Sequence, residues 1–371
     1  MKRFGMKVMV VFGTRPEAIK MCPLILELKS RLSIETVVCL SGQHRDLIAP
    51  IIECFGIKED YNLDIMKRNQ TLSDITTGII EKLKEILINE KPNLVLVHGD
   101  TTTSFAAALA SFYERIPVGH VEAGLRTYDR YSPYPEEINR QMIARIATFH
   151  FAPTKNNRDN LIKENIKENV YVTGNTVIDA FKTTIKANYI FENDLLNNLD
   201  DSNKYILLTA HRRENIGQPL INICNAVKKI VNNNKGFNVI YPVHPNPKVR
   251  DIVYSILGNN EKILLTDPLD VLDMHNLMGK CFLIMTDSGG LQEEAPALKK
   301  PVVVLRKETE RPEAIESGTA VLAGIEEDKI YNTVIDIINN SEIYGKMSNA
   351  ENPYGDGNAS KRIADILNET I

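Results

Sequence analysis

The sequence predicts an α/β protein made of two Rossmann-like domains, each built around a parallel sheet. Short apolar runs rich in β-branched residues alternate with longer segments of helical period along the chain, which is the pattern of strand–helix–strand units. The runs are apolar at consecutive positions, and this is typical of parallel strands covered by helices on both faces. A chain of 371 residues is also long for one hydrophobic core. Together these observations predict a pair of doubly wound sheets.

The expected strands are apolar runs that recur in both halves of the chain. An amphipathic segment from Pro16 to about Ser30 follows the first run and is the first expected helix. In the first half the runs are MKVMVVFG, IETVVCLSG, NLVLVHGD, IPVGHVEAG and ATFHFAPT. In the second half they are KYILLTAH, FNVIYPVH, KILLTDP, CFLIMTDSGG and PVVVLR.

The boundary between the domains is expected between about residues 170 and 200. VTGNTVIDA at 172–180 has the pattern of a strand, a turn and a helix start, and the polar, Asn- and Asp-rich segment at 191–203 precedes a strong strand. Near the C-terminus, NPYGDGNAS breaks the pattern before a last helical run, KRIADILNETI. We assign to the first domain residues 1–172 and the C-terminal helix at 356–371, and to the second domain residues 173–355.

Composition excludes several classes of function. A formal net charge of −4 without a stripe of Lys and Arg gives no electrostatic basis for nucleic-acid binding. The cysteines are scattered, odd in number and never spaced as C-x-x-C, which indicates reduced thiols of a cytosolic protein. The apolar run near the N-terminus is too short for a signal peptide, and no stretch reaches the length of a membrane span. We expect a cytoplasmic enzyme without membrane partners. The cysteines are Cys22, Cys39, Cys54, Cys224 and Cys281.

Charged and polar residues are concentrated where the expected strands end. In doubly wound sheets ligands bind beyond the carboxyl ends of the strands, so these junctions are the places to search. The junctions rich in charged and polar residues are FGTRPEAIK, HGDTTTS, HVEAGLRT, AHRREN, PVHPNP and TDSGGLQEEA.

The junction TDSGGLQEEA favours a phosphate site. Ser288, Gly289 and Gly290 place small residues and free N–H groups at the start of a helix, which suits a phosphate. A plain helix cap by Asp287 or Ser288 is the alternative. A following carboxylate, such as Glu294, can bind ribose hydroxyls. Neither the P-loop nor the G-x-G-x-x-G pattern is present, which argues against ATP hydrolysis and a bound NAD.

Basic and acidic side chains at the other junctions suit acid–base chemistry on a charged ligand. Arg15 can reach a diphosphate and Lys20 lies about one helical turn further on. As the alternative, Arg15 could merely pair with Glu17, and a lone Lys on a helix is usually solvated. Asp100, Glu122 and Glu136 follow strands or lie in loops. Brought together, these carboxylates would raise one another's pKa, which suits general acid–base catalysis; the alternative is solvated loop acids, with Asp100 capping a helix.

His211, in AHRREN, is a further candidate acid or phosphate donor. The alternative is that His211 is a structural histidine at a strand end. No spacing of His, Asp and Glu matches a metal motif, so no metal is expected, and no G-x-S-x-G elbow supports a serine hydrolase.

On these motifs the chain resembles the non-hydrolysing UDP-N-acetylglucosamine (UDP-GlcNAc) 2-epimerases. FGTRPEAIK, SGQHR, HGDTTTS, HVEAGLRT, PYPEEINR, VTGNTVID, HRREN, PVHPNP, TDSGGLQEEAP, ERPEA and NPYGDG occur in the order typical of that family and cover essentially the whole chain. The resemblance implies a GT-B-like fold with the active site in the cleft between the domains, the second of which binds UDP. It implies reversible conversion of UDP-GlcNAc to UDP-ManNAc by a homodimer without a cofactor, supplying surface polysaccharide or glycan synthesis.

The resemblance also implies roles for individual residues. The catalytic side chains it implies are Asp100, Glu122, Glu136 and His211. Substrate contacts fall on Arg15, Lys20, Ser288, Gly289, Gly290, Glu294 and Arg311, with Met274 where many relatives place an aromatic residue against the uracil. An allosteric UDP-GlcNAc site falls on Gln43, Arg68, Arg212 and His244.

Three alternatives remain open at this stage. A GT-B glycosyltransferase would need an acceptor, and a hydrolysing epimerase would release free ManNAc and UDP. A catalytically silent nucleotide-sugar sensor would have no need of three clustered acids.

Overall fold

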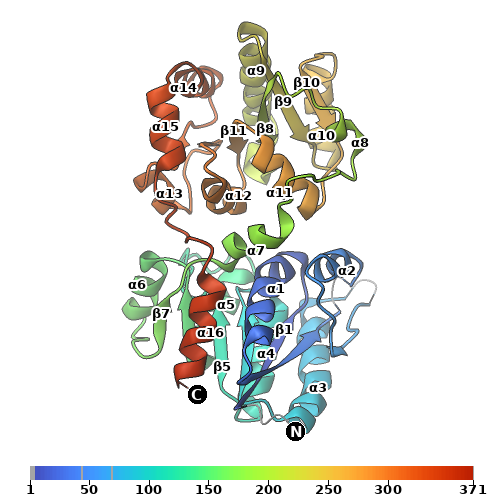
Figure 1. The fold of residues 1–371 in the computed structure, drawn as a ribbon, viewed down its shortest axis with the longest axis vertical. Helices are drawn as coiled ribbons and strands as arrows, with labels where there is room; N and C mark the ends of the chain where they lie inside the picture. The colour runs from blue at the N-terminus through green and yellow to red at the C-terminus, as the bar shows by residue number, and fades with distance from the viewer. Residues whose placement is uncertain (1–4, 43–44, 68–69, 371) are drawn as a thin grey trace. The chain divides into compact units, whose positions relative to one another are not determined.

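The computed structural model describes residues 5–42, 45–67 and 70–370 (Figure 1). Contacts between Cα atoms divide the chain into two compact units, Met1–Thr183 with Tyr354–Ile371 and Thr184–Pro353. Residues 173–183 therefore group with the first unit, whereas the sequence analysis assigned them to the second domain. The chain enters the second unit at the end of one helix and returns just before the last one.

The first unit is a parallel sheet with the strand order β3-β2-β1-β4-β5-β6-β7. Chain order runs outward from β1 in both directions, so the β1/β4 boundary is the topological switch point at which such sheets bind ligands. The strands are β1 (Met6–Phe12), β2 (Ile34–Leu40), β3 (Tyr61–Asn62), β4 (Leu94–His98), β5 (Val118–Val121), β6 (Phe149–Ala152) and β7 (Val170–Val172). The helices are α1 (Arg15–Ser30), α2 (Arg45–Cys54), α3 (Leu72–Glu90), α4 (Thr102–Tyr113), α5 (Glu136–Ile146), α6 (Lys155–Lys163), α7 (Thr176–Thr184) and the C-terminal α16 (Ala359–Thr370).

The second unit repeats the plan with the strand order β10-β9-β8-β11-β12-β13, again all parallel. Its switch point is the β8/β11 boundary. The strands are β8 (Lys204–Thr209), β9 (Phe237–Pro242), β10 (Ile263–Thr266), β11 (Leu283–Thr286), β12 (Val302–Val304) and β13 (Ala320–Leu322). The helices are α8 (Asp194–Asn197), η1 (Arg213–Asn215), α9 (Gln218–Asn233), α10 (Pro247–Leu257), α11 (Val271–Lys280), α12 (Gly289–Glu294), η2 (Ala295–Leu298), α13 (Pro312–Glu316), α14 (Glu327–Asn339) and α15 (Ser341–Asn349).

The predicted fold class is confirmed, because both sheets are parallel and alternate with helices along the chain. Every apolar run named above contains a strand. The short strands β3 and β13 were not predicted, since two or three residues carry too little periodicity to be recognised. The first helix begins at Arg15, one residue before its predicted start.

Local chemistry fixes where α1 begins. The Thr14 hydroxyl accepts from the Glu17 backbone N–H, and Glu17 accepts from the Thr14 N–H, which together form a capping box. Pro16 occupies the first helical turn, where its missing N–H costs nothing. Gly13, just before the cap, has no room for a side chain because an added Cβ would lie 1.8 Å from Ser41 Oγ. The turn between β1 and α1 is thus fixed by this cap and by the close approach of Gly13 to Ser41.

The C-terminal helix α16 is held to the first unit by a buried carboxylate. Asp179, on α7, accepts the backbone N–H of Ser360 at 2.9 Å and that of Ala359 at 3.2 Å. These are first-turn donors that the helix itself cannot satisfy. Ile363, Ala364 and Leu367 bury the inner face of α16, which packs against α1.

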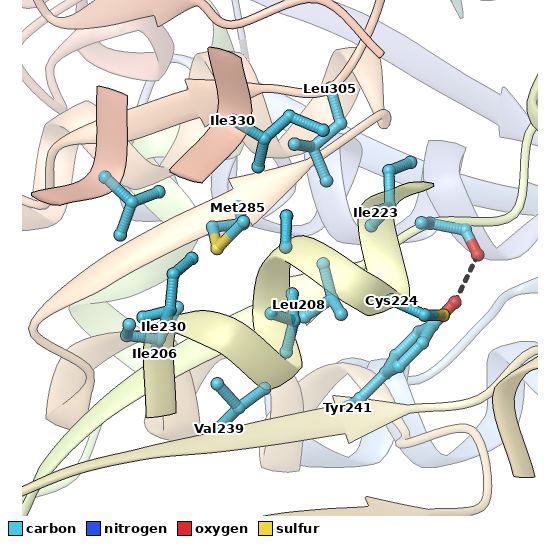
Figure 2. Close-up of a cluster of buried hydrophobic side chains, with 14 of the residues drawn as sticks. Ile206, Leu208, Ile223, Cys224, Ile230, Val239, Tyr241, Met285, Leu305 and Ile330 are labelled. Carbon is cyan, nitrogen blue, oxygen red and sulfur yellow. Dashed lines mark hydrogen bonds between the residues drawn. The ribbon is translucent and has the colours of Figure 1, made fainter. Parts of the chain in front are cut away.

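The core of the second unit reaches the end of β8 (Figure 2). Leu208 of β8, Cys224 of α9, Val239 of β9 and Met285 of β11 belong to one buried cluster. Tyr241 is fully buried in it, and its hydroxyl donates to the Ala210 carbonyl at 2.6 Å. The backbone just after β8 is therefore anchored to the core.

Candidate active site

In the first unit, one predicted basic residue and two predicted acids lie beyond the ends of three adjacent strands. Arg15 follows β1, Asp100 follows β4 and Glu122 follows β5, and the three strands are neighbours in the sheet. Parallel strands end at the same edge of a sheet, so this topology brings the three loops together at the β1/β4 switch point.

Glu122 is held by contacts on both carboxylate oxygens. Its Oε1 accepts from Lys20 Nζ and, at 3.0 Å, from Asn175 Nδ2. Its Oε2 lies 3.5 Å from His98 Nε2. Burial lowers the pKa of His98 to about 4, so this imidazole is neutral at pH 7. Of these partners Lys20 is therefore the charged one, and the sequence analysis placed it among the substrate contacts.

The backbone of Glu122 adopts a left-handed conformation, with φ of +64°. For a residue that is neither Gly, Asn nor Asp, this costs about 1–3 kcal/mol. Such strain persists where surrounding contacts over-determine it and is concentrated at functional sites. The hydrogen bonds to Lys20 and Asn175 provide those contacts.

Asp100 has a strongly raised pKa. Burial raises the pKa of its carboxyl to about 6, the Arg140 guanidinium opposes this, and the negative charges of Glu122 and Glu136 add to it. Arg140 Nη1 lies 3.5 Å from Asp100 Oδ2. The effect of the neighbouring acids matches the sequence-based expectation, whereas burial as the main cause was not anticipated.

Glu136 and Glu137 are adjacent in sequence but differ in their surroundings. Glu137 is fully buried and accepts from the backbone N–H groups of Thr127 and Tyr128 and from the Gln141 amide. Glu136 Oε2 is buried and has no hydrogen-bond partner among the described residues. Glu137 thus holds the loop before α5, and Glu136 keeps an oxygen available for a ligand.

Glu17 connects the β1 and β4 loops and was missed as a site residue. Its Oε2 accepts from the backbone N–H groups of Gly13 at 2.9 Å and Thr14 at 2.7 Å. Its Oε1 accepts from the hydroxyls of Thr101 at 2.6 Å and Ser104 at 2.8 Å. The carboxylate is only 1% exposed. It therefore fixes the loop of Arg15 relative to that of Asp100.

In the second unit, a fully buried carboxylate organises the loop after β8. Asp287, directly after β11, accepts through Oδ2 from the backbone N–H groups of His211 and Arg212, each at 2.8 Å, and from Asn215 Nδ2 at 2.9 Å. The alternative that Ser288 caps α12 through its side chain is wrong, because its hydroxyl makes no capping hydrogen bond.

Two guanidinium groups meet over the glycine turn at the start of α12. A Cβ built on Gly289 would lie 3.6 Å from Arg311 Nη2 and 3.7 Å from Arg212 Nη2. Arg311 also pairs through Nε with the buried Glu293. The first N–H groups of a helix lack partners within it, so the turn combines N–H donors with two cations and suits a diphosphate.

The remaining predicted residues of the second unit lie on the loops after β8 and β9 and on α11 and α12. The rings of His211 and His244 stack with centroids 5.5 Å apart and 10° between their planes. Glu294 Oε2 lies 3.6 Å from Nε2 of the buried His275. Met274 is half-buried on α11, directly before His275. Gly290 is exposed at the second position of α12. Gln43 and Arg68 lie outside the described residues.

The side chains that sequence reasoning missed act through other residues. His98, Arg140 and Asn175 contact predicted acids, Glu17 links two loops and Asp287 organises a third. One available indication was a charged or polar residue ending an apolar strand, as His98 does in LVLVHGD.

Neither a metal-binding cluster nor a membrane-spanning helix is present among the described residues. Within residues 5–42, 45–67 and 70–370 there is no group of three or more His, Cys, Asp or Glu side chains that could hold a metal ion. No helix in the same ranges is long and apolar enough to cross a membrane.

A pair of doubly wound sheets, with acid–base side chains at one and an arginine-lined glycine turn at the other, is typical of α/β enzymes with phosphate-bearing substrates. The chain belongs to the UDP-N-acetylglucosamine 2-epimerase family, whose model matches residues 26–368. A Bacillus subtilis (strain 168) protein named UDP-N-acetylglucosamine 2-epimerase is 52% identical, over 98% of this chain and 95% of its own length.

Solved structures agree with this assignment. The UDP-GlcNAc 2-epimerase of Neisseria meningitidis, determined with UDP-GlcNAc bound, matches with a TM-score of 0.87 and 47% identity over 98% of this chain and all of its own. The S. aureus protein MnaA, determined with UDP, matches with a TM-score of 0.86 and 46% identity over 98% of this chain and 96% of its own. The predicted GT-B-like fold class is confirmed by these likenesses.

Proposed function

We propose that this chain interconverts UDP-GlcNAc and UDP-ManNAc by inverting C2, and that it releases no free sugar. The observation that carries the proposal is the cluster of three acids in a member of this family. Asp100 has a pKa near 6 because of burial, and the charges of Glu122 and Glu136 reach it. Groups that titrate near neutral pH can both take and give a proton.

The chemistry requires the nucleotide to leave first. The hydrogen on C2 is not acidified by a carbonyl, so a carboxylate cannot simply remove it. Departure of UDP from C1 creates oxocarbenium character, which makes the C2 hydrogen acidic. Loss of that proton gives 2-acetamidoglucal and UDP. Protonation of C2 on the opposite face and return of UDP to C1 give the epimer.

The departing diphosphate is stabilised by positive charge. We assign this role to Arg311 and to the backbone N–H groups of Gly289 and Gly290, because the Arg311 guanidinium lies over Gly289. The Ser288 N–H already donates to the Thr286 hydroxyl at 2.9 Å. We assign the same role to Arg15, which lies in the first turn of α1. His211 acts on the leaving diphosphate.

The proton is carried by two groups, because it leaves one face of C2 and returns to the other. We assign these roles to Asp100, whose pKa is near 6, and to Glu136, whose Oε2 has no hydrogen-bond partner among the described residues. Glu122, which pairs with Lys20, is assigned to stabilise the cationic transition state.

Turnover in deuterated water tests the proposal. UDP-GlcNAc incubated with the protein should give UDP-ManNAc that carries deuterium at C2, because the proton removed exchanges with solvent before another is returned. Mass spectrometry and proton NMR of the nucleotide sugars measure the label. Unlabelled epimer would contradict elimination, and free ManNAc would show a hydrolysing epimerase instead. Absence of any product without an added sugar acceptor would favour a glycosyltransferase.

We also propose that UDP-GlcNAc activates the enzyme from a second site at Gln43, Arg68, Arg212 and His244. Support comes from two of these residues, since Arg212 follows His211 directly and His244 stacks on its ring. UDP-ManNAc alone should therefore turn over slowly, and a trace of UDP-GlcNAc should remove the lag. Progress curves with and without the trace measure this, with an equal trace of UDP-glucose as the control. Equal initial rates would exclude the regulatory site.

A further inference from the structure

Asp287 is a charged residue for which the proposed reaction has no direct use. Its side chain is fully buried at the end of β11, beside β8 in the sheet. Burying an unpaired carboxylate costs free energy, so the contacts of Asp287 indicate its role.

One oxygen of Asp287 fixes the loop that carries His211. Oδ2 accepts the backbone N–H groups of His211 and Arg212 and the side-chain amide of Asn215. Asn215 also donates to the Leu305 carbonyl at 3.1 Å, which ties the same loop to the end of β12. Hydrogen bonds to a charged acceptor are the stronger kind, so this oxygen determines the position of the loop.

The other oxygen faces the His211 ring. Asp287 Oδ1 is buried, has no hydrogen-bond partner among the described residues and lies 3.6 Å from His211 Nδ1. That distance is longer than a hydrogen bond, and a small rotation of the exposed imidazole closes it. The His244 ring covers one face of His211, and His244 Nδ1 accepts from the Asn246 N–H at 3.1 Å. The His211 imidazole is thus confined by the anchored backbone that carries it, by the His244 ring on one face and by Asp287 Oδ1 beside Nδ1.

We propose that Asp287 is a positioning residue that holds a proton on His211 Nδ1, so that Nε2 is the nitrogen that serves the reaction. In the forward step the imidazolium form of His211 gives its Nε2 proton to an oxygen of the leaving diphosphate and becomes the neutral ring, with Nδ1–H directed at Asp287. In the reverse step Nε2 takes that proton back. This inference rests on the proposed function, because it assumes that His211 acts on the leaving group. A carboxylate that fixes the tautomer and orientation of a catalytic imidazole is an established device in enzymes.

The variant Asp287→Asn separates orientation of the ring from anchoring of the loop. The amide oxygen takes the place of Oδ2, since three N–H donors meet there, and the amide NH2 group then faces His211 Nδ1. An NH2 group can only donate, so Nδ1 must become the acceptor and the proton moves to Nε2. The loop keeps its anchor and the tautomer is reversed.

Histidine NMR measures this reversal without reference to activity. With ¹⁵N-labelled histidine, the neutral His211 ring of the wild-type protein should carry its proton on Nδ1, and in Asp287→Asn on Nε2. The chain has seven histidines, and the His211 resonances are assigned by their loss in His211→Gln. The matched control is Asp267→Asn, at an exposed carboxylate that pairs with Arg250. The same tautomer in wild type and Asp287→Asn would overturn the proposal.

Kinetics provide the second measurement. Asp287→Asn should lower kcat about 100-fold, while the Kd for UDP from calorimetry changes less than about 3-fold, because Arg311 and the glycine turn remain. A residue with only a structural role would change both, together with the unfolding midpoint. An unchanged kcat in a variant with the reversed tautomer would also overturn the proposal. If the wild-type protein shows no epimerase activity, the proposed function fails, and the NMR result still decides whether Asp287 sets the tautomer.

Discussion

The variant Asp100→Asn should lose about 1000-fold in epimerase kcat and yet be more stable than the wild-type protein at neutral pH. Activity falls because an amide cannot carry the proton of C2. Stability rises because the native fold keeps the Asp100 carboxyl in a partly buried place near Glu122 and Glu136, where burial and their charges raise its pKa to about 6. The amide of the variant carries no charge, so placing it in this site has no such cost.

The sign of the pH dependence follows from the raised pKa. In the unfolded chain Asp100 ionises near its ordinary value of 3.8, whereas in the fold it ionises near 6. Its contribution to stability is therefore fully present below about pH 4 and is lost as the pH rises through 6. The stability advantage of Asp100→Asn should grow with pH, by about 2 kcal/mol at most between pH 4.5 and 7.5.

Urea unfolding followed by circular dichroism at several pH values measures this difference. Asp159→Asn is the matched control, since Asp159 pairs with Arg158 on the surface of the same unit. Its difference from the wild-type protein should not vary with pH. A constant difference for Asp100→Asn as well would contradict the raised pKa, and retained activity would remove Asp100 from the proton transfer.

The variant Glu17→Ala should destabilise the first unit by about 3–5 kcal/mol and abolish turnover. Glu17 is buried and accepts four hydrogen bonds, from the backbone of Gly13 and Thr14 and from the hydroxyls of Thr101 and Ser104. Alanine leaves the backbone N–H groups of Gly13 and Thr14 without this acceptor, and each buried polar group that loses its partner costs about 1–3 kcal/mol. The Ser104 hydroxyl can still donate to the His98 carbonyl at 2.6 Å. The loops of Arg15 and Asp100 also lose the side chain that connects them.

Hydrogen exchange measured by mass spectrometry tests this prediction, because it reports each unit separately. Protection should fall in β1 and β4 and remain in β8 and β11. Glu17→Gln should be milder, since its amide oxygen can still serve the backbone donors while the hydroxyls rotate. Glu27→Ala is the control on the same helix, where Glu27 pairs with Arg31 near the surface. Loss of protection equal to that of Glu27→Ala would show that Glu17 does not hold the loops.

Much of the architecture could be predicted from the sequence because its cause is local. The runs MKVMVVFG and KYILLTAH are apolar at consecutive positions, and both form central parallel strands. The start of α1 follows from Thr14, Pro16 and Glu17, which cap the helix whatever lies around it. The two-residue strand β3 could not be predicted, because it exists only through pairing with β2.

The candidate site was predictable only in part. The junctions after β1, β4, β5, β8 and β11 follow from the rule that ligands bind beyond the carboxyl ends of parallel strands. The roles of neighbouring acids do not follow. Glu136 and Glu137 are chemically identical in the sequence, and the fold alone buries Glu137 in hydrogen bonds while leaving an oxygen of Glu136 without a partner among the described residues.

The sequence by itself determined the longer parallel strands, the start of α1 and the motifs of the epimerase family, because strand pattern and capping act over a few residues. The tertiary structure alone decided which charges meet. Lys20 and Glu122, and likewise His211 and Asp287, are far apart along the chain and come together only when β1 lies near β5 and β8 lies beside β11. A pKa or a tautomer depends on distances of a few ångströms and on burial, and the fold alone determines both.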